Sequence, residues 1–225
     1  MAQFYIPDLS ENDYIIELNE EESKHSVRVL RLNTDDTLTL LNGKGLSAHG
    51  KIVDAHPKKC KIQIESFNFH TKTKEIHIAV CPTKSIDRME WLVEKAVELG
   101  LTKLTFLLSK NSERTQIKME RLEKIAVAAM KQSKRFYLPE IQWSKDVSSF
   151  VSEYQNGFIA HCYPGDKVSS ESDILNNPIL IGPEGDFTVD EVEIALKNGY
   201  RGLDLGEFRL RTETAALTAV FCLRK

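Results

Sequence analysis

The sequence predicts an α/β protein in two parts, a small N-terminal β-barrel and a mostly parallel sheet covered by helices on both faces. Before residue 70, short apolar runs alternate with turn residues, as in small barrels. After residue 75, strand and helix patterns alternate instead, which is typical of a parallel sheet. The polar stretch 67–74 separates the two patterns, so the expected domains are residues 1–70 and 71–225.

The N-terminal part is expected to hold five strands and one helix. The helix begins at the acidic run 20–22 and continues through residue 30. Lys24, Arg28 and Arg31 follow the spacing i, i+4, i+7 and would share one face, with His25 beside them. Such a basic stripe is usually a solvated helix face, and a lone histidine is more often structural than catalytic. The expected strands are 4–6, 14–18, 37–41, 46–53 and 61–65.

In the C-terminal part the alternation predicts strands and helices in turn. The last helix, 214–223, is apolar on nearly all sides and must therefore be buried on several of them. Because true knots are very rare, the pattern alone predicts an unknotted doubly wound sheet. The other expected elements are strands 76–80, 103–108, 141–143 and 157–161, and helices 85–99, 121–134 and 147–154.

Two segments near the C-terminus read as buried strand, glycine turn and helix. In the first, strand 179–181 meets glycines at 182 and 185, and Thr188 and Glu191 form a capping box that opens the next helix. In the second, strand 203–205 meets Gly206, and a helix opens near Thr212. Either loop alone would be an ordinary turn. Two of them predict a ligand site, because open α/β sheets bind ligands outside the carboxyl ends of their strands.

Composition narrows the function classes. A net charge of −3 over 225 residues does not indicate nucleic-acid binding, so any RNA contact would require local cationic patches. No apolar run approaches the ~18 residues that a membrane span needs, and no export signal is evident. Cys60, Cys81, Cys162 and Cys222 lack metal-site spacing. They are expected to be buried reduced thiols in a cytoplasmic protein without a metal.

A set of segments spread along the chain carries a family resemblance. They are 181–185, 205–206 and 210–215, with His25, 29–31, Lys84, 95–100, 112–114, Gln132, Ser133, Arg135 and Pro139. These segments resemble the RsmE family of 16S rRNA (uracil-N3) methyltransferases, which belongs to the SPOUT class. The resemblance implies a trefoil-knotted C-terminal domain, a PUA-like RNA-binding barrel, and a homodimer with its active site at the subunit interface. It also implies S-adenosylmethionine as methyl donor, and a uridine N3 in 16S rRNA or the small ribosomal subunit as acceptor.

The resemblance also implies roles for particular residues. Arg211 would orient the target base or neutralise charge on its oxygens. Glu184 and Glu213 lie near the expected site, but helix capping explains Glu213 at least as well, and no general base is assigned. The expected cofactor-binding residues are Ile181, Gly182, Gly185, Leu205, Gly206 and Leu210. The expected RNA-binding residues are Lys24, Arg28, Arg31, Lys84, Arg114 and Arg135.

The chain departs from the family pattern at three places. Asp186 stands where a second glycine is usual, the arginine expected near 208 is at 209, and Lys131 replaces a usual glutamate. Two other functions remain open: a non-catalytic RNA- or ribosome-binding protein, and the same fold acting on tRNA or on another nucleoside atom. Binding of S-adenosylmethionine separates the enzyme from the non-catalytic binder.

Overall fold

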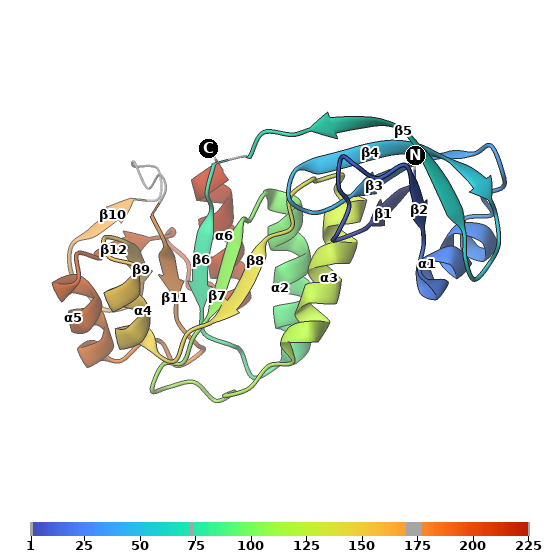
Figure 1. The fold of residues 1–225 in the computed structure, drawn as a ribbon. Helices are drawn as coiled ribbons and strands as arrows, with labels where there is room; N and C mark the ends of the chain where they lie inside the picture. Colours follow the sequence, from blue (N-terminus) through green and yellow to red (C-terminus); the bar gives the residue numbers. More distant parts are fainter. Residues whose placement is uncertain (1, 73, 170–176, 225) are drawn as a thin grey trace. The chain divides into compact units, whose positions relative to one another are not determined.

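The computed structural model describes residues 2–72, 74–169 and 177–224, which divide into two compact units (Figure 1). The first unit comprises residues 1–73 together with 130–138, and the second comprises 74–129 and 139–225. A short stretch from the middle of the chain therefore belongs to the N-terminal unit, which a single boundary near residue 70 does not anticipate.

The N-terminal unit is a curled sheet of five short strands in the order β1-β3-β4-β5-β2. β1 pairs with β3 in parallel, and the remaining pairs are antiparallel. Alternate side chains such as Phe4, Leu38 and Ile62 fill the interior of the curl. The strands are β1 (Gln3–Tyr5), β2 (Ile15–Glu17), β3 (Thr37–Leu41), β4 (Leu46–Asp54) and β5 (Lys61–Phe69).

The helix of this unit differs from the expected one. α1 (Glu20–Lys24) begins at the N-cap Asn19, and the chain then continues as a π-helix, η1 (His25–Val29). The π turn is closed by the Leu30 N–H, which donates to the His25 carbonyl at 2.9 Å. Arg31 follows the helix in a left-handed conformation with φ of 57°. The α-helical spacing that places Lys24, Arg28 and Arg31 on one face therefore does not apply here.

Segment 130–138 packs against the curled sheet through both backbone and side chains. Gly45 N donates to the Phe136 carbonyl at 3.0 Å, and Leu138 N donates to Gly43 at 2.8 Å. The rings of His70 and Phe136 stack with centroids 3.3 Å apart. These long-range contacts assign the segment to the first unit.

The second unit is built on a seven-stranded sheet in which every pair is parallel, in the order β10-β12-β9-β11-β6-β7-β8. β11 lies between β9 and β6, so the carboxyl ends of β9, β11 and β12 meet on one edge (Figure 1). The strands are β6 (His77–Val80), β7 (Lys103–Phe106), β8 (Glu140–Trp143), β9 (Phe158–Ala160), β10 (Lys167–Ser169), β11 (Ile179–Ile181) and β12 (Arg201–Asp204). β10 has no apolar run and was not predicted.

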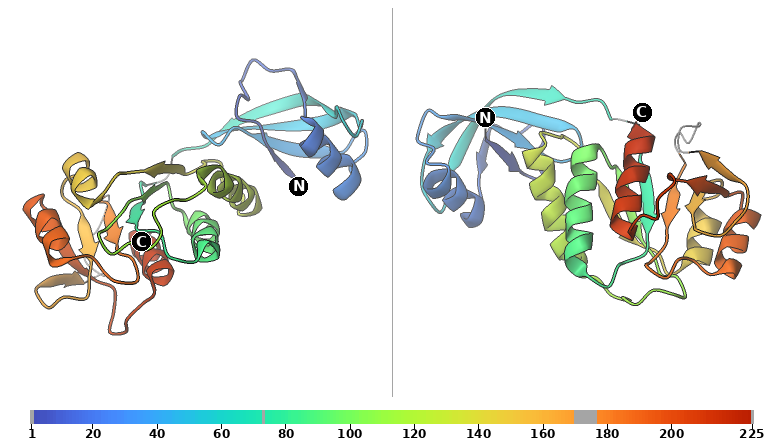
Figure 2. Two further views of the ribbon diagram at one scale, coloured as in Figure 1. Left: turned by 90° about the horizontal axis from the view of Figure 1, so that it is seen from below. Right: turned by 180° about the vertical axis from the view of Figure 1, so that it is seen from behind.

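Helices cover both faces of this sheet, as predicted (Figures 1 and 2). α6 (Thr212–Arg224) packs against α2 (Ile86–Leu99) and strands β6 and β11, whereas α4 (Val147–Glu153) packs against α5 (Val189–Lys197). α3 (Met119–Gln132) leads into segment 130–138. α5 has the predicted capping box of Thr188 and Glu191.

α6 is less buried than its composition suggests. Ala216, Ala219, Val220 and Leu223 are buried against the sheet, but Phe221 is 51% exposed. The helix is buried on the sides that face α2, β6 and β11, and the side that carries Phe221 is exposed in the single chain. The trefoil knot stays a prediction. No helix among the described residues is long and apolar enough to cross a membrane.

His77 gives the second unit a pH-dependent stability. Its side chain is 4% exposed and lies within hydrogen-bond distance of Thr105 Oγ1, at 2.8 Å. Burial, with a smaller effect of Lys103, lowers the pKa of His77 to about 3. Between pH 6.5 and about 3 the ring therefore stays neutral in the folded protein, whereas it binds a proton in the unfolded chain.

The stability due to His77 is complete above pH 6.5 and decreases as the pH falls toward 3. We expect a loss of roughly 2 kcal/mol between pH 6.5 and 5, at about 1.4 kcal/mol per pH unit. Urea unfolding of the wild type and of His77→Gln at several pH values measures this, since glutamine does not titrate. Equal pH slopes in the two proteins would contradict the expectation.

Candidate functional site

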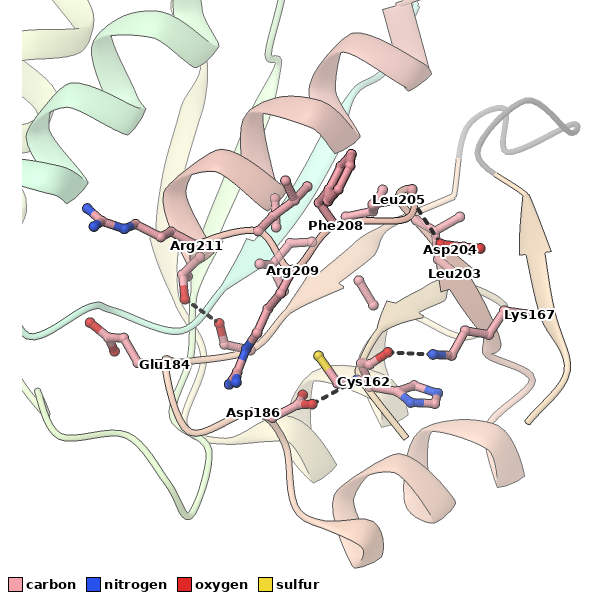
Figure 3. A pocket seen from close by; sticks show the side chains of 18 of the residues that line it. Cys162, Lys167, Glu184, Asp186, Leu203, Asp204, Leu205, Phe208, Arg209 and Arg211 are labelled. Atoms are coloured by element: carbon pink, nitrogen blue, oxygen red, sulfur yellow. Dashed lines mark hydrogen bonds between the residues drawn. The ribbon is translucent and has the colours of Figure 1, made fainter. Parts of the chain in front are cut away.

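A cavity lies at the carboxyl ends of β9, β11 and β12 (Figure 3). Its volume is about 670 Å³, within the usual range for small-molecule sites. We call it the loop pocket, because the loops that follow β9, β11 and β12 form most of its wall. It is lined by residues 160–162, 167, 181–184, 186, 203–212 and 215.

The loop that follows β11 is fixed by three other segments. Thr212 Oγ1 at the start of α6 donates to the Gly182 carbonyl at 3.0 Å. Asn111 Nδ2, after β7, donates to the carbonyls of Gly185 and Asp186 at 3.1 and 3.0 Å. The Tyr163 hydroxyl, after β9, donates to Phe187 at 2.7 Å. These bonds hold the loop in one conformation and bring its partners to the same edge of the sheet.

Asp186 connects two of the loops. Its carboxylate accepts hydrogen bonds from the backbone N–H groups of Cys162 and Phe187, both at 2.8 Å. Its φ of 63° is left-handed, which a glycine adopts without strain and an aspartate adopts at low cost. Asp186 thus keeps a glycine-like backbone and adds a carboxylate to the pocket wall. Burial, followed by the charge of Asp186, raises the pKa of the Cys162 thiol.

The three glycines of the predicted cofactor site have different roles. A Cβ added to Gly182 would lie 3.2 Å from the Phe187 ring, and one added to Gly185 would lie 3.2 Å from Asn111 Cβ. Both glycines therefore permit close packing within the protein. Gly206 has φ of 123°, and an added Cβ there would meet no atom within 4 Å. Gly206 is thus the glycine whose missing side chain leaves open space.

Most of the predicted cofactor residues converge on the loop pocket. Ile181, Gly182, Leu205, Gly206 and Leu210 line it, whereas Gly185 is not part of the lining. The three apolar side chains supply nonpolar wall, and the glycines expose backbone.

Arg211 also lines the loop pocket, but its side chain extends away from Cys162 and Asp186 (Figure 3). Glu184 accepts a hydrogen bond from Lys84 N at 3.1 Å. Glu213 is 7% exposed, with Oε1 3.6 Å from Arg88 Nε, and its Oε2 has no partner within the described part of the chain. The contacts of these two carboxylates do not identify either of them as a proton acceptor in the pocket.

The predicted RNA-binding cations lie in both units. In the second unit, Lys84 pairs with Glu113 at 3.0 Å, and Arg114 donates to the carbonyls of Thr83 and Lys84. Lys84 and Arg114 line a smaller cavity of about 330 Å³. The remaining four, Lys24, Arg28, Arg31 and Arg135, belong to the first unit. Arg114 therefore has a structural function whether or not it contacts RNA.

Several lining residues were not predicted as site residues, among them Lys167, Asp186, Phe208 and Arg209. Arg209 projects into the pocket toward the loop that carries Asp186 (Figure 3). Phe208 is 80% exposed. The only sequence signal for Asp186, Phe208 and Arg209 is that they are departures from the family pattern. Cys162 was expected to be buried, but it is exposed, two residues beyond the end of β9 at the pocket edge; Cys222 is only partly buried.

Comparisons with known proteins agree with this architecture. A family model described as "RNA methyltransferase domain" matches residues 70–224, and one described as "RNA methyltransferase PUA domain" matches 18–65. The "Ribosomal RNA small subunit methyltransferase E" of Rickettsia conorii is 30% identical over 228 residues, covering 96% of this chain and 91% of the relative.

Solved structures give the same result. A probable rRNA-methyltransferase from Porphyromonas gingivalis is 36% identical with a TM-score of 0.88, covering 98% of this chain and 95% of that one. A putative methyltransferase from Legionella pneumophila, solved with bound S-adenosylmethionine, is 27% identical with a TM-score of 0.83, covering 98% of this chain and 96% of that one.

Proposed function

Because the chain belongs to the ribosomal RNA small subunit methyltransferase E family, we propose that it methylates N3 of a uridine in 16S rRNA, with S-adenosylmethionine as donor. The observation that carries the proposal is the loop pocket, which lies where open parallel sheets bind ligands and is lined by five of the six expected cofactor residues.

The loop pocket fits the donor in size and chemistry. Its volume of about 670 Å³ admits a nucleoside with an amino-acid tail. Leu205 and Leu210 provide apolar walls for the adenine, and Gly206 leaves room beside the backbone. When bound, S-adenosylmethionine supplies an electrophilic methyl group on its sulfonium. The chain must hold that group in line with the acceptor, and the bonds that fix loop 182–187 give the required rigidity.

On the acceptor side, the uracil must be oriented and its N3 proton must leave. Arg211 is at the pocket wall with its side chain directed outward, where it would contact the uracil oxygens and stabilise charge on them. We propose no general base: Glu184 accepts a hydrogen bond from Lys84 N, and Glu213 is buried and does not line the loop pocket.

We assign RNA binding to residues 1–70 and to cations of both units, and catalysis to residues 71–225. Lys24, Arg28, Arg31, Lys84, Arg114 and Arg135 would contact phosphates, and such contacts make affinity fall with salt. A titration of RNA affinity against salt concentration tests this: a flat dependence would contradict it.

We further propose a cytoplasmic homodimer. The support is apolar surface on neighbouring helices, because Trp91 on α2 is 46% exposed and Phe221 on α6 is 51% exposed. Light scattering should give twice the chain mass of 25.6 kDa, and a single-chain mass would contradict the dimer.

The function is tested by donor binding followed by methyl incorporation. We expect calorimetry to show one S-adenosylmethionine per chain. Labelled methyl groups should enter small ribosomal subunits or 16S rRNA from cells that lack this activity, but not large subunits or tRNA. Incorporation into tRNA alone would favour the tRNA-modifying alternative. A protein that does not bind the donor would support the non-catalytic binder.

A further inference from the structure

Resting on the proposed function, we propose that Arg209 and Asp186 form the site for the amino-acid tail of the donor. In this assignment the Arg209 guanidinium binds the tail carboxylate, and the Asp186 carboxylate binds the tail ammonium. The two residues come from different loops, after β12 and after β11, and meet only in the folded chain.

Arg209 is the pocket cation that is free to bind an anion. Lys167 Nζ donates to the His161 carbonyl at 2.7 Å, and Arg211 is directed away from the pocket interior (Figure 3). Arg209 points inward, and within the described residues it donates no hydrogen bond and forms no ion pair. A guanidinium without a partner at a pocket wall matches a carboxylate in both charge and geometry.

Asp186 is the complementary anion. The backbone N–H groups of Cys162 and Phe187 fix its carboxylate, and each oxygen keeps a lone pair for a further donor. Arg209 extends toward the loop that carries Asp186 (Figure 3). The two charges therefore lie at the same end of the pocket, as the ammonium and carboxylate of an α-amino acid do.

Three ligands separate the two contacts. S-adenosylhomocysteine carries both the carboxylate and the ammonium, its decarboxylated form carries only the ammonium, and 5′-methylthioadenosine carries neither. We expect Arg209→Gln to lower the affinity for S-adenosylhomocysteine about tenfold to hundredfold, the usual contribution of a charge-assisted hydrogen bond. The affinities for the other two ligands should stay within about twofold of wild type. Asp186→Asn should lower the affinities for S-adenosylhomocysteine and its decarboxylated form and leave the affinity for 5′-methylthioadenosine unchanged.

Calorimetry measures these affinities at fixed ionic strength. Lys197→Gln removes an equal charge from an exposed position outside the pocket, and it should leave all three affinities unchanged. Arg209→Lys should retain part of the S-adenosylhomocysteine affinity. Thermal melting shows whether each variant is folded, and asparagine is chosen at 186 because it tolerates the left-handed backbone.

Two results would overturn the assignment. Equal weakening of all three ligands by Arg209→Gln would mean that Arg209 supports the pocket generally. Unchanged affinities with a raised KM for rRNA would mean that Arg209 contacts phosphate instead. If the wild-type protein binds none of the three ligands, the proposed function fails together with this assignment, which is a distinct result.

Discussion

Gly206→Val should abolish measurable donor binding, with a loss of at least about 100-fold in affinity, or roughly 2.7 kcal/mol. Gly206 lines the loop pocket, and an added Cβ would stand in open space with no protein atom within 4 Å. The valine side chain would therefore occupy space that the ligand needs. Calorimetric titration with S-adenosylmethionine measures the loss.

Gly165→Val is the matched control for this prediction. Gly165 has φ of 141°, also with no atom within 4 Å of an added Cβ, but it does not line the pocket. Both variants thus carry comparable backbone strain. Gly165→Val should keep its donor affinity within about twofold of wild type. Similar loss in both variants would show that strain, and not blocked space, is responsible.

Glu191→Gln should lower the free energy of unfolding by roughly 2–4 kcal/mol, the range for breaking a buried hydrogen-bonded carboxylate. Glu191 is 6% exposed and accepts four hydrogen bonds. They come from Ser109 Oγ, Lys110 N, and the N–H and hydroxyl of Thr188, at 2.8–2.9 Å. Glutamine places an N–H₂ donor among these donors. Urea unfolding measures the change.

The same substitution should also weaken donor binding. Glu191 fixes the loop that contains Asn111, and Asn111 donates hydrogen bonds to the carbonyls of Gly185 and Asp186 beside the pocket. Glu193→Gln is the control. Glu193 lies on the same helix but is exposed, at 3.7 Å from Lys197, and its loss should cost less than about 0.5 kcal/mol. A Glu191→Gln protein as stable as Glu193→Gln would contradict a supporting function for the buried carboxylate.

The parts of the structure that were predictable from sequence are those set by local rules. The Thr188 and Glu191 capping box, the strand at 179–181 and the helix after Gly206 depend on residues within a few positions of one another. Because these elements form in the same way whatever the rest of the fold, the loop pocket could be located from its strands and glycines.

What could not be predicted depends on distant segments. The sequence identifies Glu191 only as a helix-capping residue, yet two of its hydrogen-bond donors, Ser109 and Lys110, lie about 80 positions away. Segment 130–138 joins the N-terminal unit through contacts with Gly43, Gly45 and His70 that no local pattern encodes. Side-chain direction in the irregular loop 205–211 has no period, so the inward position of Arg209 was not anticipated.

The central claim is that this chain methylates uridine N3 in small-subunit rRNA. The most direct test treats unmodified 16S rRNA and small subunits with the protein and S-adenosylmethionine, digests the RNA to nucleosides, and identifies them by mass spectrometry. We expect new 3-methyluridine, and a marked reduction of it with Arg211→Ala. Donor binding without 3-methyluridine on either substrate would contradict the claim.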